Sequence, residues 1–490
     1  MLGVAVVTAV SVGAGAGASI SAAKVSQPTV SGPVSGGKGR PTIAGPDANV
    51  SDPTYVSEEY FLSGTATAYT SGKPLTKNGR WSAKPASTAP YTTRVVVYRP
   101  ASAQKFDGTV FVEWLNVSAG GDSSPDWTAA HLQIARAGAA WVGVSAQQVG
   151  VQGGTDILGE PSGGGLKAAD PARYASLAHP GDSYSYDIFS QTGAAVRRPA
   201  KSGLLGGLPV KHVIAMGESQ SAFRMVTYIN AIQPLVHVFD GFLVHSRAAS
   251  AARLAQKPLQ QVGANGPVLI RSDIDVPVLT LQTETDLLPT GLGYLPARQP
   301  DSKHFRLWEV AGTAHADVYT TLGFGDNGDG KAEITLLDPA AIGGGPLGCS
   351  TPINAGPTYA VLNAAVFQLE RWVRDGTPPP HAPRMTIAGG TRPTIARDAH
   401  GIALGGIRTP LVDAPIATID GTPNQGGPFC SLFGSTKPFD AATLAALYPT
   451  HAAYVAKFNR SADRAVKAGF LLPPEAKNLK AAAAQSSIGG

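Results

Sequence analysis

The sequence has few charged residues, no cluster of basic residues and, after its N-terminal segment, no long apolar run. Only 15% of the 490 residues are Asp, Glu, Lys or Arg, against about 25% in an average soluble domain. The formal net charge of +5 is spread thinly along the chain, so no surface is expected to follow a phosphate backbone, and nucleic-acid binding is not expected. Because no later stretch reaches the roughly 18 apolar residues of a spanning helix, we expect no transmembrane segment in the mature chain.

Cysteine is scarce as well, with only Cys349 and Cys430 in the chain. Both lie in Gly/Pro-rich contexts, and neither has the His or Cys neighbours typical of a metal site, so no metal site is predicted. In an exported chain the simplest use of two cysteines is one disulfide. Two buried thiols are the alternative.

The N-terminal segment favours export. Residues 4–12 are almost wholly apolar and small residues follow up to Ala23, which is typical of the apolar core and cleavage site of a signal peptide. We therefore predict a signal peptide at 1–23 and a secreted or cell-envelope protein. No Lys or Arg precedes Lys24, so an Ala/Gly-rich tail is the alternative. Residues 24–55, rich in Ser, Gly, Pro and Thr, predict a flexible linker.

Apolar strands alternate with helical segments in the rest of the chain. The strand candidates are TTRVVVYRP (92–100), GTVFVEWLN (108–116), AWVGVSAQQ (140–148), VKHVIAMG (210–217), FDGFLVHS (239–246), VPVLTLQTE (276–284) and HFRLWEVAG (304–312). Near-continuous apolar strands separated by helices indicate a mostly parallel central sheet with helices on both faces. We predict one α/β domain at 56–475, with loop-rich insertions and a C-terminal extension, and a disordered tail at 476–490.

The most informative segment is VIAMGESQSAFRMV (213–226). An apolar strand there runs into the turn GESQS and then into an amphipathic helix, which is the setting of a nucleophile elbow. The residues two before and two after the nucleophile must be small, because strand and helix nearly touch. Gly217 and Ser221 meet that need, although the common pattern has Gly at the second position. We predict Ser219 as the nucleophile, with an ordinary Gly-Ser turn as the alternative.

A serine nucleophile needs a base, and the base needs a carboxylate that fixes its tautomer. Hydrolases with this elbow carry the acid and then the histidine downstream of the serine. His315 follows the strand candidate 304–312 and is the predicted base, with a solvated loop residue as the alternative. Two carboxylates compete after the strand candidate 276–284. Asp286 lies past the strand end and is preferred, and Glu284, with its longer side chain, is the alternative acid.

The negative charge of a tetrahedral intermediate needs backbone N–H donors aimed at it. Gln220, the residue after the nucleophile, is one predicted donor of this oxyanion hole. The loop after the strand candidate 108–116 is expected to supply the other, from either Asn116 or Val117.

These residues resemble a bacterial α/β-hydrolase-domain family of mostly exported, esterase-like proteins with a GESQS-type elbow. The resemblance extends over about residues 55–475. It is carried by VEWLNVSAGGDSSPDW (112–127), WVGVSAQQVGV (141–151), DSYSYDIFSQ (182–191), GESQSA (217–222), QTETD (282–286), WEVAGTAHAD (308–317) and GGIRTPLVDAPIA (405–417). It implies the α/β-hydrolase fold and a triad of Ser219, Asp286 and His315, but it does not decide between Asp286 and Glu284.

The sequence therefore predicts a serine hydrolase that cleaves carboxylic esters through an acyl-enzyme intermediate. This chemistry requires neither a metal nor an organic cofactor, and the expected partner is a small-molecule or lipid-like ester. Two alternatives are an acyltransferase that uses the same triad and a non-enzymatic binding protein on a hydrolase scaffold.

Overall fold

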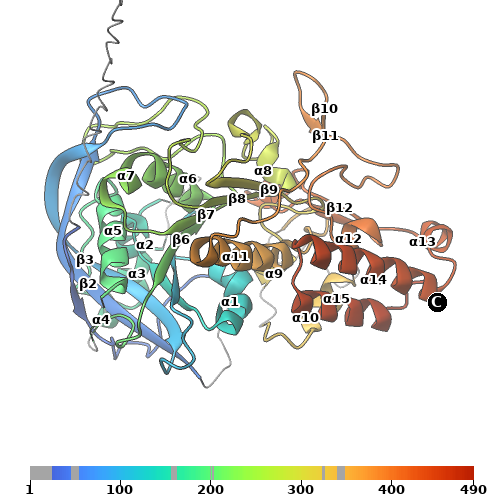
Figure 1. Ribbon diagram of the computed structural model, residues 1–490, viewed down its shortest axis with the longest axis horizontal. Coiled ribbons are helices and arrows are strands. Elements are labelled where there is room, and N and C mark those ends of the chain that lie inside the picture. Colours follow the sequence, from blue (N-terminus) through green and yellow to red (C-terminus); the bar gives the residue numbers. More distant parts are fainter. Residues whose placement is uncertain are drawn as a thin grey trace, which may run out of the picture.

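The described part of the chain is organised around one large β-sheet. The computed structural model describes residues 25–45, 54–155, 163–198, 200, 203–322, 326–338 and 348–489. Within these residues the large sheet has nine strands in the order β1-β2-β3-β5-β4-β6-β7-β8-β9 (Figure 1). The strands are β1 (Thr29–Ser31), β2 (Tyr55–Thr70), β3 (Lys84–Pro100), β4 (Thr109–Trp114), β5 (Ala140–Val144), β6 (His212–Glu218), β7 (Gly241–His245), β8 (Val278–Gln282) and β9 (Phe305–Glu309).

The six strands β4 to β9 form the parallel part of this sheet. Each neighbouring pair in the order β5-β4-β6-β7-β8-β9 is parallel, whereas β1, β2 and β3 extend one edge antiparallel. In Figure 1 the long strands β2 and β3 (blue) lie at one end of the molecule and the C-terminal helices (red) at the other. The predicted α/β fold with a mostly parallel sheet is confirmed.

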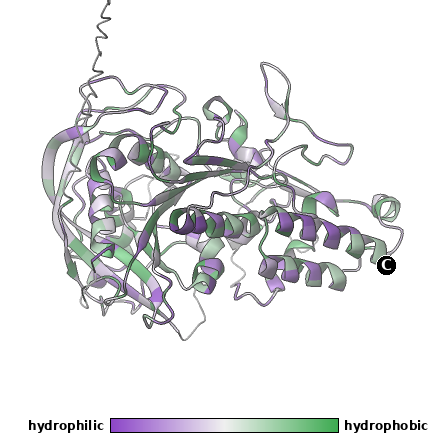
Figure 2. Cartoon of the chain, viewed as in Figure 1, coloured by the Kyte–Doolittle hydropathy of each residue, from purple (hydrophilic) through white to green (hydrophobic). Residues whose placement is uncertain are grey.

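Helices cover both faces of the parallel strands. Alternate side chains of a strand point to opposite faces. In β4, Val110 and Val112 therefore join the buried cluster on one face of the sheet, and Phe111 joins the cluster on the other face. The helices up to α11 are α1 (Pro125–Ala137), α2 (Gln148–Gln152), α3 (Gly165–Ala169), α4 (Pro171–Tyr174), α5 (Ser185–Val196), α6 (Gln220–Thr227), α7 (Gln233–Val236), α8 (Glu284–Leu287), α9 (Val318–Leu322), α10 (Lys331–Leu336) and α11 (Thr358–Asp375). Burial on both faces explains the near-continuous apolar strands, which Figure 2 shows largely in green.

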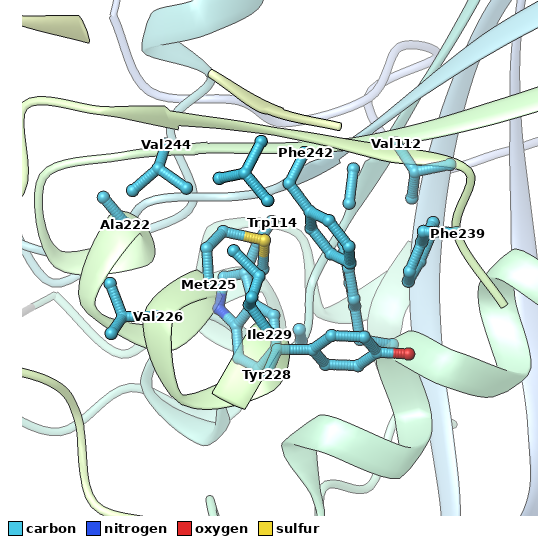
Figure 3. Close-up of a cluster of buried hydrophobic side chains, with 14 of the residues drawn as sticks. Val112, Trp114, Ala222, Met225, Val226, Tyr228, Ile229, Phe239, Phe242 and Val244 are labelled. Carbon is cyan, nitrogen blue, oxygen red and sulfur yellow. The ribbon is translucent and has the colours of Figure 1, made fainter. Parts of the chain in front are cut away.

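Helix α6 is held against the sheet by a dense apolar cluster (Figure 3). Ala222, Met225 and Val226 on the helix pack with Phe242 and Val244 of β7, and all five side chains are fully buried. The helix cannot shift without opening this cluster, because buried side chains are close-packed. The turn that precedes α6 is thereby fixed in position.

The chain beyond α11 folds back against the β9 edge of the sheet, where the Ile407 N–H donates to the Glu309 carbonyl over 2.7 Å. It contains the small sheets β10 (Ile387–Ala388) with β11 (Thr394–Ile395) and β12 (Ala417–Asp420) with β13 (Ser435–Pro438), and the helices α12 (Pro410–Asp413), α13 (Ala441–Leu447), α14 (His451–Ala468) and α15 (Pro473–Gln485). Cys349 and Cys430 form a disulfide with Cα atoms 5.5 Å apart. None of the helices in the described ranges has the length and apolar character needed to cross a membrane.

The structure differs from the sequence expectation at both ends. The predicted disordered tail 476–490 is wrong, because α15 covers most of it and buries Ala476, Leu479 and Ala483. These three residues have the spacing of one helical face, which the Ala-rich composition concealed. The predicted flexible linker 24–55 contains β1, which pairs with β2. The predicted signal peptide at 1–23 lies outside the described residues.

Because α15 is packed, truncating its central apolar side chain should destabilise the protein. We expect Leu479→Ala to lower the free energy of unfolding by about 2 to 5 kcal/mol, the range for a buried leucine. Lys477 lies two residues before Leu479, on the exposed side of the same helix. Lys477→Ala should therefore leave the free energy of unfolding nearly unchanged. Chemical denaturation followed by circular dichroism measures both, and equal stability of the two variants would show that the helix is not part of the folded core.

Candidate active site

Ser219 lies in the sharp turn between β6 and α6. Its φ is 54° and its ψ is −120°, a positive φ that costs a residue with a side chain about 1 to 3 kcal/mol. A Cβ atom on Gly217 would lie 3.1 Å from the Ser221 Cβ and 3.2 Å from the Met225 Cγ, so the strand and the helix leave room there for little more than glycine. Ser221 is itself fully buried. The turn therefore has the geometry of a nucleophile elbow.

His315 and Asp286 meet Ser219 from two other loops at the same end of the sheet. The Nε2 atom of His315 is 2.8 Å from the Ser219 Oγ, and its Nδ1 atom is 2.7 Å from the Asp286 Oδ1. All three side chains are at most 8% exposed. An imidazole held between a hydroxyl and a carboxylate can take the hydroxyl proton and keep the resulting positive charge stabilised.

Asp286 is oriented by the short helix α8 on which it lies. The Thr283 backbone N–H donates to the Asp286 Oδ2 atom over 2.7 Å, which leaves Oδ1 to accept from His315. This contact is half of a capping box around Thr283, so the same interaction starts the helix and aims the carboxylate.

Glu284, the alternative acid, is engaged elsewhere. Its Oε1 atom accepts from the Gly312 N–H at 2.6 Å, and its Oε2 atom accepts from the Gly421 N–H at 3.1 Å and from Arg397 Nη2 at 2.7 Å. The Glu284 carboxylate thus links the segment that carries Asp286 to the loop that carries His315 and to the C-terminal region. Of the two carboxylates that the sequence left open, only Asp286 is hydrogen-bonded to His315 in the described structure.

The C-terminal region supports the two loops that carry Asp286 and His315. The Thr285 hydroxyl donates to the Gly421 carbonyl over 2.8 Å, and the Ala316 N–H donates to the Leu432 carbonyl over 3.1 Å. Leu432 lies two residues after Cys430, so the disulfide anchors the same segment. Sequence reasoning missed Arg397 and Gly421, because nothing in their local sequence points to a loop that lies more than a hundred residues earlier.

The two predicted sources of the second oxyanion donor differ in the structure. The Asn116 N–H donates to the Ser123 carbonyl over 2.9 Å, so the prediction of Asn116 as a donor is corrected: its amide hydrogen is used within its own loop. Among the described residues no acceptor is assigned to the backbone N–H of Val117 or of Gln220. Gln220 begins α6, where the first N–H groups have no partner within the helix.

A second carboxylate, which the sequence analysis did not single out, also faces His315. The Glu218 Oε1 atom lies 3.3 Å from the His315 Nε2, and the side chain is nine-tenths buried. Burial raises the pKa of Glu218 to about 7, against the opposing effect of His315 and His245. Burial alone would lower the pKa of His315, but the charges of Glu218 and Asp286 outweigh it and raise this pKa to about 9. The only signal in the sequence was the acidic residue directly before Ser219.

Among the described residues, no group of three or more His, Cys, Asp or Glu side chains is arranged to hold a metal ion.

Comparison with known proteins assigns the chain to a family. A family model described as an alpha/beta hydrolase domain matches residues 30–481, and no curated protein matches the chain. Similar solved structures include a fungal esterase from Rhizomucor miehei (13% identity, 67% of this chain and 87% of that chain covered, TM-score 0.32). A serine hydrolase without a lid from Xanthomonas campestris (13%, 53% and 86%, 0.28) and a glucuronoyl esterase from Solibacter usitatus (8%, 59% and 83%, 0.28) are others. Because the family match spans nearly the whole described chain and includes all three loops of the site, the chain belongs to the alpha/beta hydrolase domain family.

Proposed function

We propose that this protein is a serine hydrolase that cleaves carboxylic esters through an acyl-enzyme. The observation that carries the proposal is the unbroken hydrogen-bonded line from the Ser219 Oγ through both nitrogens of His315 to the Asp286 Oδ1. The strained turn at Ser219 supports it, as do the N–H groups of Gln220 and Val117, which have no acceptor among the described residues. The substrate we propose is a small-molecule or lipid-like ester.

The reaction follows from the roles that these positions allow. Ser219 attacks the ester carbonyl carbon while His315 takes the hydroxyl proton, and Asp286 stabilises the imidazolium. The N–H groups of Gln220 and Val117 donate to the oxyanion of the tetrahedral intermediate. His315 then gives its proton to the leaving alkoxide, which departs as the alcohol. Water, activated by the neutral imidazole, hydrolyses the acyl-Ser219 ester to the free acid and restores the hydroxyl.

Hydrolysis of a graded series of p-nitrophenyl esters tests the function directly. The full chain should release p-nitrophenol, and Ser219→Ala should lower kcat by about 10⁴-fold or more, because the nucleophile acts as a unit with its base. Ser221→Ala is the matched control, since Ser221 lies two residues further along and its buried hydroxyl has no hydrogen-bond partner in the described part of the chain. Equal activity of the wild type and Ser219→Ala, or no hydrolysis of any ester by the folded wild type, would contradict the proposal.

The two acidic candidates should separate by the kind of damage that their amide variants cause. Asp286→Asn should lower kcat by about 10⁴-fold, because an amide neither fixes the imidazole tautomer nor stabilises its charge. Glu284→Gln keeps that contact and weakens hydrogen bonds to Gly312, Gly421 and Arg397, so it should lower the free energy of unfolding by about 1.5 to 3 kcal/mol with a smaller loss of kcat. Steady-state kinetics and thermal unfolding of both variants give the comparison, and the reversed pattern would make Glu284 the acid.

We also propose that the protein is exported. The apolar segment at 4–12 with small residues after it and the disulfide between Cys349 and Cys430 support this. Protein collected outside the cytoplasm should have lost the leader near Ala23 and should gain the mass of two hydrogens on reduction of the disulfide. Intact-mass spectrometry reads both, and an uncleaved chain with two free thiols would contradict export.

A further inference from the structure

Glu218 contacts both halves of the proposed catalytic apparatus. Its Oε1 atom is 3.3 Å from the His315 Nε2, the nitrogen that faces Ser219. Its Oε2 atom accepts from the Asn116 Nδ2 at 3.0 Å, and the same Nδ2 also donates to the Glu218 carbonyl at 3.1 Å. The buried Glu218 side chain thus joins the proposed base, His315, to the loop that carries Val117.

The position of the Glu218 oxygen affects the protonation state of His315. When Nε2 carries a proton, it donates toward two oxygens, the Ser219 Oγ at 2.8 Å and the Glu218 Oε1 at 3.3 Å. When Nε2 is unprotonated, its lone pair faces the negative carboxylate. An opposite charge at this distance favours the protonated imidazole, and burial strengthens the effect because the local dielectric constant is low.

The other ionisable groups facing Glu218 come from four elements. His245 ends β7, Asp126 lies on α1, Asp286 lies on α8, and His315 follows β9. The two imidazoles favour the ionised Glu218 and the two aspartates oppose it. His245 is itself paired with Asp126, with 2.8 Å between Nδ1 and Oδ1. Acids and imidazoles therefore alternate from Asp126 through His245, Glu218 and His315 to Asp286.

Asn116 transmits the position of Glu218 to the proposed oxyanion loop. Its Oδ1 atom accepts from the Ser118 N–H at 2.7 Å, while its backbone N–H and carbonyl pair with Ser123. Val117 thus lies between Asn116, whose side chain is bound to Glu218, and Ser118, whose N–H is bound to the Asn116 side chain. A shift of Glu218 would move the Val117 N–H relative to Ser219.

We propose that Glu218 is a positioning residue that stabilises the protonated form of His315 and, through Asn116, holds the Val117 amide where the oxyanion forms. This inference rests on the proposed serine hydrolase function. A base accepts a proton only when it is neutral, so raising its pKa moves the lower edge of the active pH range upward. The same negative charge stabilises the imidazolium that forms when Ser219 attacks, so Glu218 raises the maximal rate while it narrows the pH range.

The test is the pH dependence of the second-order rate at which a fluorophosphonate modifies Ser219 in the full chain. Wild type should lose reactivity as the pH falls, with a midpoint above about 6.5, the ordinary histidine pKa. Glu218→Gln, which keeps an acceptor oxygen for Asn116, should lower that midpoint by about one to three pH units. It should also lower the plateau rate at high pH.

Glu370→Gln is the matched control for removing a buried carboxylate. Glu370 lies on α11 and contacts Thr109 at the start of β4, at the end of the sheet opposite Ser219. The pH midpoint of its labelling should equal that of the wild type. Asn116→Ala tests the link to the loop: because it keeps the Glu218 carboxylate, it should slow the plateau rate by about 10²-fold, the lower cost of losing one oxyanion donor, and its midpoint should stay above that of Glu218→Gln.

Several outcomes would overturn the inference. Equal pH midpoints of labelling for the wild type and Glu218→Gln would show that Glu218 does not affect the protonation of His315. An unchanged plateau rate in Asn116→Ala would show that Asn116 does not position the loop that carries Val117. Should Glu218→Gln fail to fold, a wild-type midpoint at or below about 6.5 is sufficient to reject the inference. A folded wild type that is not labelled at Ser219 at any pH rejects the proposed function itself, which separates the two failures.

Discussion

The positive φ of Ser219 is the constraint on which the site depends. A residue with a side chain adopts φ 54° only where the surrounding structure enforces it. Here β6 enforces it from one side and the packed helix α6 from the other, with Gly217 providing the space between them. The apolar cluster around Met225 and Phe242 in Figure 3 therefore stabilises more than the core. It holds the turn that presents the hydroxyl of Ser219 to His315.

Asp286 and His315 are held by a different part of the chain. Glu284 binds Gly312 in the histidine loop and also Gly421 and Arg397 beyond α11. The C-terminal extension is thus part of the framework that sets the distance between Asp286 and His315. Its disulfide joins Cys430 to Cys349 ahead of α11, and its final helix, α15, packs against α14 and α10. The sheet and α6 thus fix the position of Ser219, and the C-terminal extension helps to fix the positions of Asp286 and His315.

Local patterns were enough to predict the fold and to single out most residues of the candidate site, and long-range contacts explain what they missed. The strand, turn and helix around Ser219 are neighbours in sequence, so their pattern can be read directly, and parallel strands bring the following loops to the same sheet edge. The choice between Asp286 and Glu284 depends on residues 397 and 421, which no local pattern links to them. The Asn116 amide is used because the loop returns at Ser123. Glu218 is part of the GESQS turn, but its contact with His315 depends on the path of the loop after β9, which the local sequence does not specify.

The central claim is that Ser219 carries the acyl group during turnover. The most direct measurement mixes the full chain with p-nitrophenyl acetate, quenches it with acid within the first turnovers and maps the acetyl group by peptide mass spectrometry. The account predicts an acetylated peptide containing Ser219, formed at the rate of the first p-nitrophenol release and absent from Ser219→Ala. Turnover of the ester with Ser219 unmodified, or with the acetyl group on another residue, would contradict it.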